Sequence, residues 1–222
     1  MKNRYIQHSH LPESTFRLII KAFSNDLNAL ETAGWTGVNR NTVNRLFGLL
    51  RVRIAKISLE ESATLGIFEV DESYFGAKRV RGKRGRGAAG KTPVFGLLKR
   101  DGKVFISVVD NCSKEQLLPI IQGKVLEGST IHSDGWRAYD SLILNGYQHY
   151  RVFHSHNEFA RGKCHVNGIE AFWSYAKRRL ARRNGFSTSD LPVHLKETEF
   201  RYNNRSNDLY PIMIASLKNM PL

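Results

Sequence analysis

The sequence predicts an α/β protein: a mixed sheet flanked by helices and preceded by a helical N-terminal region. Two observations carry this fold class. Residues 12–56 repeat apolar side chains at helical spacing, and from about residue 64 short runs rich in β-branched and aromatic residues alternate with helical stretches. A chain of 222 residues can bury one sizeable core and a small accessory module. We therefore expect two domains, over residues 1–60 and 61–222.

Three helices are expected in the N-terminal region. The first follows Pro12, which suits a first helical turn, and the second would end at Gly34. Asn39 or Asn41 would cap the third helix. The apolar face of the third helix holds Val43, Leu46, Phe47 and Leu50, and its other positions hold Arg40, Asn44, Arg45, Arg51 and Arg53.

The polar side of this third helix has the composition of a recognition helix, in which arginine and asparagine contact base edges and phosphates. Residues 1–60 are therefore predicted to form a helix-turn-helix-like DNA-binding region, with Arg40 and Arg45 among its DNA contacts. A small helical bundle with a solvated basic face is the alternative.

The second region is expected to contain the order β-β-β-α-β-α-β-α. Its β-prone runs are Gly66–Phe75, Pro93–Lys99, Val104–Asp110, Ser129–Ser133 and Tyr147–Phe153, and its helical stretches are Lys114–Gln122, Trp136–Leu144, Val166–Arg183 and Asp190–Asn203. Asp101-Gly102 lies between two strand-like runs, which is a strong hairpin signal. We therefore predict that the first three strands form an antiparallel meander.

Residues 77–92 form a basic loop between the first two expected strands. The segment holds seven basic residues and no acidic ones, and its repeated glycines make regular structure costly. We expect a phosphate backbone to order it, with Lys83, Arg84 and Arg86 as DNA contacts. A loop that only raises solubility is the alternative.

The charge of the whole chain favours a polyanionic partner. Lys and Arg total 34 against 20 Asp and Glu, a net charge of +14. A membrane is the competing polyanion, but the sequence has no run of about 18 apolar residues. We expect a cytoplasmic protein that binds DNA. The two cysteines, Cys112 and Cys164, form no Cys-x-x-Cys pair, so we assign them to packing.

Three acidic residues lie at points where the chain changes direction or structure. Asp71 lies within an apolar strand, Asp134 ends a strand before a glycine, and Glu170 lies in the first turns of a long helix. A carboxylate placed against a core is costly unless it is paired or binds a metal. Three oxygen ligands from separate segments suit Mg²⁺ or Mn²⁺, and two such ions can support in-line phosphoryl displacement.

The spacing and motifs resemble a known family of enzymes. Between Asp134 and Glu170 lie 35 residues, and this Asp, Asp, Glu order resembles the ribonuclease-H-like, or retroviral-integrase-like, nucleotidyltransferases. The chain is still more similar to bacterial insertion-sequence DDE transposases with an ISXO-like domain. The motifs that carry this similarity are Val70–Tyr74, Ser133–Tyr139, Phe153–Ser155 and His165–Lys177. The chain departs from many relatives because no cysteines for a zinc ribbon precede Cys112.

The resemblance implies a transposase that cuts transposon ends and joins them to target DNA, and that acts as a homo-oligomer on DNA. It implies Asp71, Asp134 and Glu170 as ligands of two Mg²⁺ or Mn²⁺ ions, and Lys177 as a DNA-end contact. Arg178, which follows Lys177 in a basic run, is expected to track phosphates. The alternatives are a non-catalytic DNA-binding protein derived from a transposase and a ribonuclease-H-like nuclease.

Several neighbours of the three acids are candidates for supporting roles. Asn167 lies three residues before Glu170 and could orient it or cap the helix, and His165 is expected to support the site or contact phosphate. Glu69 and Glu72 flank Asp71 and are rival metal ligands. Strand alternation places Glu69 on the face of Asp71 and Glu72 on the opposite face.

Overall fold

The computed structural model describes residues 3–59, 62–76, 91–134, 145–152, 166–183 and 187–222. The chain divides into two compact units, one formed by Met1–Ile57 with Asn204–Leu222 and the other by Ser58–Asn203. The C-terminal residues of the chain thus belong to the first unit, although the range 61–222 expected from the sequence grouped them with the sheet.

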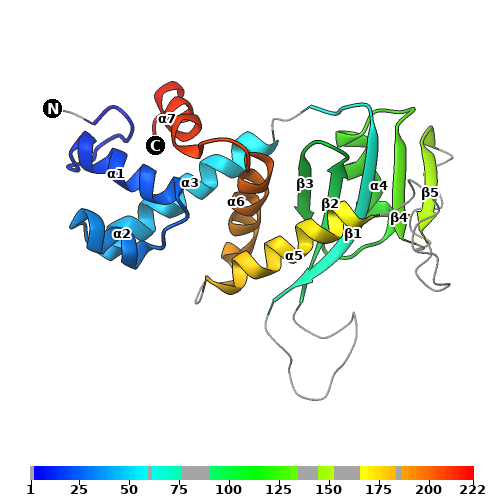
Figure 1. Cartoon of the computed structure of the whole chain (residues 1–222), viewed down its shortest axis with the longest axis horizontal. Helices are drawn as coiled ribbons and strands as arrows, with labels where there is room; N and C mark the ends of the chain where they lie inside the picture. The colour runs from blue at the N-terminus through cyan, green and yellow to red at the C-terminus, as the bar shows by residue number, and fades with distance from the viewer. Residues whose placement is uncertain (1–2, 60–61, 77–90, 135–144, 153–165, 184–186) are drawn as a thin grey trace, which may run out of the picture. The chain divides into compact units, whose positions relative to one another are not determined.

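The first unit is helical. Its helices are α1 (Glu13–Ser24), α2 (Ala29–Thr36), α3 (Arg40–Leu59, whose last turn reaches the second unit) and α7 (Leu209–Asn219) (Figure 1). Phe16, Phe23 and Phe47 are buried in its core, and α7 packs against α1. The three helices expected before residue 60 are therefore present, and α7 was not predicted.

The turn between α2 and α3 is short and well capped. The side chain of Asn28 accepts hydrogen bonds from the backbone of Leu30 and Glu31 and so caps α2. α2 ends at Gly37, whose φ of 70° is left-handed, so Gly37 and not the expected Gly34 is the stop. Asn39 accepts the backbone N–H of Asn41 and is therefore the cap of α3.

The second unit contains a five-stranded sheet of order β3-β2-β1-β4-β5. The strands are β1 (Ile67–Phe75), β2 (Thr92–Lys99), β3 (Val104–Val108), β4 (Thr130–Asp134) and β5 (Gln148–Val152). β2 pairs antiparallel with both β1 and β3, whereas β4 pairs in parallel with both β1 and β5. The expected meander and the expected mixed α/β sheet are confirmed. The helix predicted at 136–144 lies outside the described residues.

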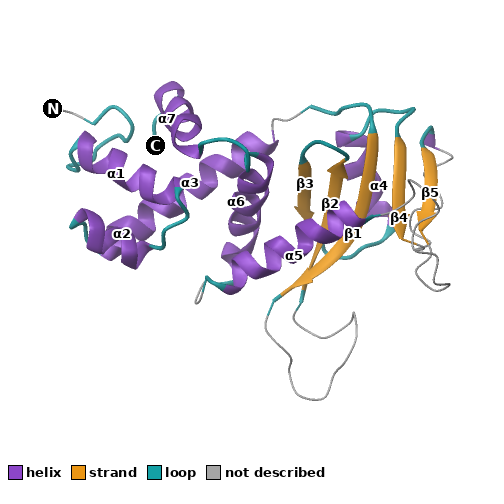
Figure 2. Ribbon diagram, viewed as in Figure 1, coloured by secondary structure: helices purple, strands orange, loops and turns teal. Residues whose placement is uncertain are grey.

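Helices cover both faces of this sheet (Figure 2). α4 (Lys114–Lys124) covers one face and α5 (Asn167–Ala181) the other, whereas α6 (Leu191–Asn203), which follows a short 3₁₀ turn at Thr188–Asp190, packs against α5 and β3. Val70 of β1 packs in one core with Leu117 and Ile121 of α4, whereas Val94 of β2 packs in another with Ile169 and Phe172 of α5. Because side chains alternate along a strand, Asp71 faces the α5 side of the sheet.

α6 covers the hydrogen-bonding edge of β3. The Asn203 side chain accepts the Val104 N–H at 2.8 Å and donates to the Val104 carbonyl at 2.8 Å. The Glu199 carboxylate accepts the Ile106 N–H at 2.7 Å. These are backbone groups of an edge strand that β2 leaves unused, and side chains of α6 satisfy them.

Candidate active site

Two of the three predicted acids lie side by side in the sheet. The parallel pairing of β1 and β4 places Val70 opposite Ser133. Asp71 and Asp134 are the next residues on each strand, so they occupy equivalent positions on neighbouring strands. Asp134 is the last residue of β4, and both side chains are half-buried.

The third acid reaches this place on α5, which crosses the sheet over β1 and β2. Two glycines allow a close approach. Gly96 lies opposite Asp71 in the β1–β2 register, and a Cβ there would lie 2.5 Å from Cζ2 of Trp173. A Cβ on Gly168 would lie 2.5 Å from Cδ2 of Leu98. Larger residues at either position would push α5, and with it Glu170, away from the sheet.

Asp134 and Glu170 act electrostatically on Asp71. Burial, followed by the negative charges of Asp134 and Glu170, raises the pKa of Asp71 from 3.8 to about 6. A hydrogen bond from the backbone of Glu72 opposes this rise. The site therefore concentrates negative charge that a bound cation would neutralise.

Trp173 lies one turn after Glu170 and forms a wall of this site. Its indole ring is buried against Gly96, and the N–H of the ring lowers the pKa of Asp71. Among the residues that the structure describes, Nε1 nevertheless has no hydrogen-bond partner at normal geometry. The N–H is therefore close enough to favour the charged carboxylate but does not bond to it in this arrangement.

The carboxylates of Asp71, Asp134 and Glu170 suit a hard divalent cation, although their present orientation does not form a complete binding group for one. Carboxylate oxygens are the ligands that Mg²⁺ and Mn²⁺ prefer, and the pKa of Asp71 is raised by burial first and by the two neighbouring negative charges after it. Within the described ranges, no three His, Cys, Asp or Glu side chains form a group that could hold a metal ion as they stand. A cation would therefore require the carboxylates to turn toward it.

The family of this chain follows from its match to a family model. The model of the ISXO2-like transposase domain matches residues 64–203, which include all three acids. The chain belongs to this transposase family. The family resemblance expected from the sequence is thereby confirmed.

Two named relatives agree with this membership. A Haemophilus influenzae protein, named an uncharacterized transposase-like protein, is 41% identical over 102 residues, covering 46% of this chain and 82% of the relative. A Halobacterium salinarum protein, named an uncharacterized protein in transposable element ISH50, is 31% identical over 152 residues, covering 61% of this chain and 52% of the relative. The chain therefore spans about half the length of the second relative.

Solved structures of another transposase also show a distant likeness. The Mos1 strand transfer complex matches with 14% identity and a TM-score of 0.35, over 96% of this chain and 78% of that chain. The Mos1 paired end complex with Mg matches with 12% identity and a TM-score of 0.36, over 96% and 81%. With TM-scores this low, the likeness to Mos1 says nothing about the function of this chain.

Glu69 is held in hydrogen bonds elsewhere and is not arranged as a metal ligand. It is 1% exposed, and its two oxygens contact Nε of Arg100 at 3.0 Å and the backbone N–H of Ile169 at 3.0 Å. Glu72 faces the opposite side of the sheet, as alternation predicted. The role of Glu69 was missed in the sequence because its partners lie far along the chain.

The basic run that follows Glu170 divides between solvent and core. Lys177 and Arg178 are exposed on α5, where a phosphate backbone could reach them. Arg179 is 5% exposed and binds Glu197 of α6 at 2.6 Å. The predicted contacts Lys177 and Arg178 are thus available, whereas Arg179 holds α5 against α6.

The predicted recognition helix is likewise divided. Arg40 and Arg45 of α3 are exposed, as a DNA contact requires. Arg51 is 9% exposed and lies over the rings of Phe23 and Phe47. Arg53 donates to the carbonyl of Pro221. Of the arginines on this helix, Arg51 therefore packs within the first unit and Arg53 bonds within it, whereas Arg40 and Arg45 remain predicted DNA contacts.

Asn167 does not cap α5. It is the exposed first residue of the helix, and the N-cap is Val166, whose side chain offers no hydrogen bond. His165 and the loop residues Lys83, Arg84 and Arg86 lie outside the described residues. No helix in the described part of the chain is long and apolar enough to span a membrane.

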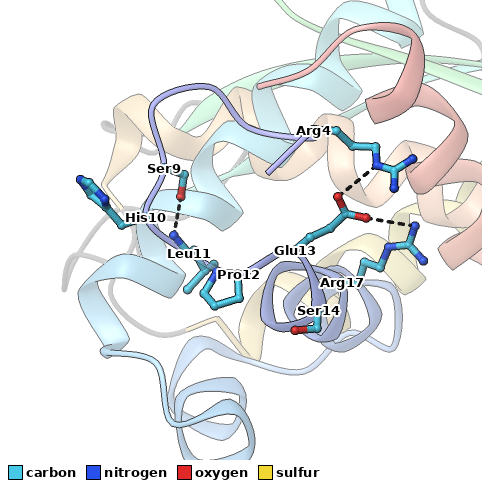
Figure 3. A pocket seen from close by; sticks show the side chains of 8 residues that line it. All are labelled: Arg4, Ser9, His10, Leu11, Pro12, Glu13, Ser14 and Arg17. Carbon is cyan, nitrogen blue, oxygen red and sulfur yellow. Dashed lines mark hydrogen bonds and ion pairs between the residues drawn. The ribbon is translucent and has the colours of Figure 1, made fainter. Parts of the chain in front are cut away.

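A pocket of about 950 Å³ lies in the first unit, around the start of α1 (Figure 3). Glu13 projects into it between Arg4 and Arg17, with oxygen-to-nitrogen distances of 3.0 and 3.4 Å. The carboxylate pairs with both arginines, so their charge is partly offset within the pocket lining. None of the predicted site residues lines it.

Proposed function

We propose that this protein is a transposase that cuts DNA at transposon ends and joins the freed ends to target DNA. The observation that carries the proposal is the placement of Asp71 and Asp134 at equivalent positions on the paired strands β1 and β4, on the face that α5 crosses with Glu170 in its first turn. Membership of the ISXO2-like transposase family and a relative from a transposable element support it.

In this proposal, Asp71, Asp134 and Glu170 hold two Mg²⁺ or Mn²⁺ ions. When bound, the ions would supply Lewis-acid assistance to in-line displacement at a phosphodiester. The three side chains would fix the position of the reacting phosphate relative to the sheet. Exposed Glu170 and half-buried Asp134 leave the site open to a DNA strand.

The chemistry takes place in two steps on the same site. In the first, water displaces the 3′-oxygen of a strand at the transposon end, which leaves a free 3′-hydroxyl and a 5′-phosphate. In the second, that 3′-hydroxyl displaces a 3′-oxygen of the target strand, so one phosphodiester forms as another breaks. The protein needs no covalent intermediate for either step.

DNA binding would come from separate basic surfaces. Exposed Arg40 and Arg45 of α3 are suited to reading a transposon end in the major groove. Lys177 and Arg178 would hold phosphates near the cleaved bond, and Lys83, Arg84 and Arg86 would add contacts that do not depend on sequence. Pairing of two ends implies more than one copy of the chain on DNA.

Incubation of the purified protein with its own inverted-repeat DNA and Mg²⁺ tests the proposal. We expect wild-type protein to cleave and join, and Asp71→Asn, Asp134→Asn and Glu170→Gln each to abolish both reactions while end binding is kept. Glu115→Gln, an exposed acid on α4, is the matched control and should react as wild type does. Cleavage without joining would indicate a nuclease, and binding without cleavage by wild type would indicate a non-catalytic DNA-binding protein.

A further inference from the structure

Glu69 of β1 connects the strand of Asp71 to the helix of Glu170. Its Oε2 accepts the backbone N–H of Ile169, the residue before Glu170, at 3.0 Å. Glu69 and Asp71 are two residues apart on one strand and share a face. A single side chain from the Asp71 strand therefore bonds directly to the first turn of α5.

This bond replaces a cap that α5 lacks. The first N–H groups of a helix have no partner within the helix, and the N-cap residue Val166 offers no side-chain acceptor. A carboxylate at this end also interacts favourably with the positive end of the helix dipole. Glu69 supplies both the acceptor and the charge, from a strand about 100 residues earlier in the chain.

A further contact fixes Glu69 itself, and Gly168 leaves room for it. Nε of Arg100, in the turn after β2, donates to Oε1 at 3.0 Å, so the buried carboxylate is paired on its other oxygen. A Cβ on Gly168 would lie 2.8 Å from Oε2, so glycine is needed for the helix to come this close. Glu69 is 1% exposed, which keeps water from competing for these bonds.

We propose that Glu69 is a positioning residue that sets the distance between Glu170 and the Asp71–Asp134 pair. In this role Glu69 is not itself a metal ligand, and it acts through the first turn of α5. Arg100 holds the charge of Glu69 in place, and Gly168 allows the contact. The inference rests on the proposed function, because the distance matters only where the three acids share their ligands.

The affinity for a metal ion depends on this distance and can be measured directly. We would titrate the full-length protein with Mn²⁺ and follow the free ion by electron paramagnetic resonance. Loss of an outer partner of metal ligands typically weakens metal binding about 10–100-fold, and we expect Glu69→Ala to fall in this range. Glu69→Gln should weaken binding less, because its amide oxygen can still accept the Ile169 N–H. Gly168→Ala should weaken it from the opposite side of the same contact.

Glu199 provides a matched control. It too is a buried carboxylate that accepts a backbone N–H, from Ile106, and pairs with a cation, Lys196, at 2.8 Å. Glu199 touches the edge strand β3 and not the start of α5. Glu199→Gln should cost stability as Glu69→Gln does, yet leave the Mn²⁺ affinity unchanged.

Hydrogen exchange of the amides in the first turn of α5 gives a readout that needs no metal, and Glu69→Ala should accelerate it. Wild-type Mn²⁺ affinity in Glu69→Ala would overturn the inference and leave the proposed function standing. Equal losses in Glu69→Gln and Glu199→Gln would also overturn it, because the effect would then reflect stability alone. A wild-type protein that binds no Mn²⁺ would refute the proposed metal site, and the positioning role with it.

Discussion

At the scale of single residues, the ionised carboxylate of Asp71 lowers the stability of the folded protein, and a bound cation would relieve this cost. It lies on a strand, beside a second carboxylate at the same level of the sheet and beneath a third on a helix. Burial and like charges both favour its protonated form. A protein selected for stability alone would not keep such an arrangement, and this contrast is what makes the site a candidate for function.

The cost at Asp71 predicts how stability depends on pH without metal. The folded-state pKa of about 6 lies above the ordinary 3.8, so ionisation opposes folding, and stability falls as pH rises from about 4 to 6. Asp71→Asn should remove this penalty and stabilise the metal-free protein by roughly 1–3 kcal/mol at pH 8. Urea unfolding in the presence of a chelator would measure it at pH 8 and pH 4. An equal gain at both pH values would contradict the prediction.

Lys177 should act on DNA and not on metal. It follows Glu170 by seven residues, about two helical turns or 10 Å along the axis, which is too far for routine ion pairing. Lys177→Ala should weaken binding of end DNA by about 1–3 kcal/mol and leave the Mg²⁺ dependence of cleavage unchanged.

Lys114→Ala provides the comparison for this variant, because Lys114 is exposed on α4, which covers the opposite face of the sheet. Fluorescence anisotropy with labelled end DNA would report affinity, and Lys177→Arg should retain most of it. If Lys177→Ala bound ends normally but required much more Mg²⁺, the lysine would belong to the metal site.

The sequence is informative about residues whose role depends on local pattern. Asp71, Asp134 and Glu170 could be selected because each lies at a strand or helix position recognisable from its neighbours. The role of Glu69 could not be found this way, because it bonds to Ile169, 100 residues away. Gly96 is similar, since only the packed indole of Trp173 reveals why glycine is required there. Of the two roles open to Asn167 from the sequence, capping α5 is not the one that the structure shows, and orienting Glu170 remains a prediction.

At the scale of elements, periodicity predicted the strands and most helices because each buries one face. Two errors concern the helices: one boundary was misplaced and one helix was missed. Gly34 was expected to end α2, but the left-handed position that favours glycine is at Gly37. α7 was missed although its start carries signals: Asp208 accepts the Tyr210 N–H, and Pro211 lies in the first turn.

The pairing of α5 with α6 depends on a buried charge cluster. Glu197 is fully buried and binds Arg179 at 2.6 Å and Arg201 at 2.8 Å. Glu197→Ala would leave two buried arginines without this partner, and such a loss typically costs about 3–5 kcal/mol. Urea unfolding should show that loss, with a smaller one for Glu197→Gln, which keeps an acceptor. A change below about 1 kcal/mol for Glu197→Ala would show that water replaces the carboxylate readily.

At the scale of the whole molecule, the chain returns to its first unit after completing the second. Met213 and Leu217 of α7 are buried in the unit that α1 begins. Sequence patterns assign a helix to a segment but do not say which core receives it. The domain to which the last residues belong was therefore not accessible from the sequence.

The net charge of +14 predicts a strong salt dependence of DNA binding, to which the basic loop over residues 77–92 contributes seven cations. Replacing all seven with serine should flatten the slope of log affinity against log salt concentration by up to about 0.9 per lost phosphate contact. Binding measured at several salt concentrations would show it. An unchanged slope would place the loop away from bound DNA.

The side chains of α6 that cover the edge of β3 also affect aggregation at high local protein concentration. Exposed strand edges invite strands from other copies, which is a common route to uncontrolled aggregation. Proteins that gather on one short stretch of DNA reach high local concentrations, where this risk is greatest. Because Asn203 and Glu199 already occupy backbone groups of Val104 and Ile106, a neighbouring copy cannot extend the sheet at these positions. α6 therefore protects this edge of the sheet against strand-to-strand association between copies, and this role does not depend on the chemistry of Asp71, Asp134 and Glu170.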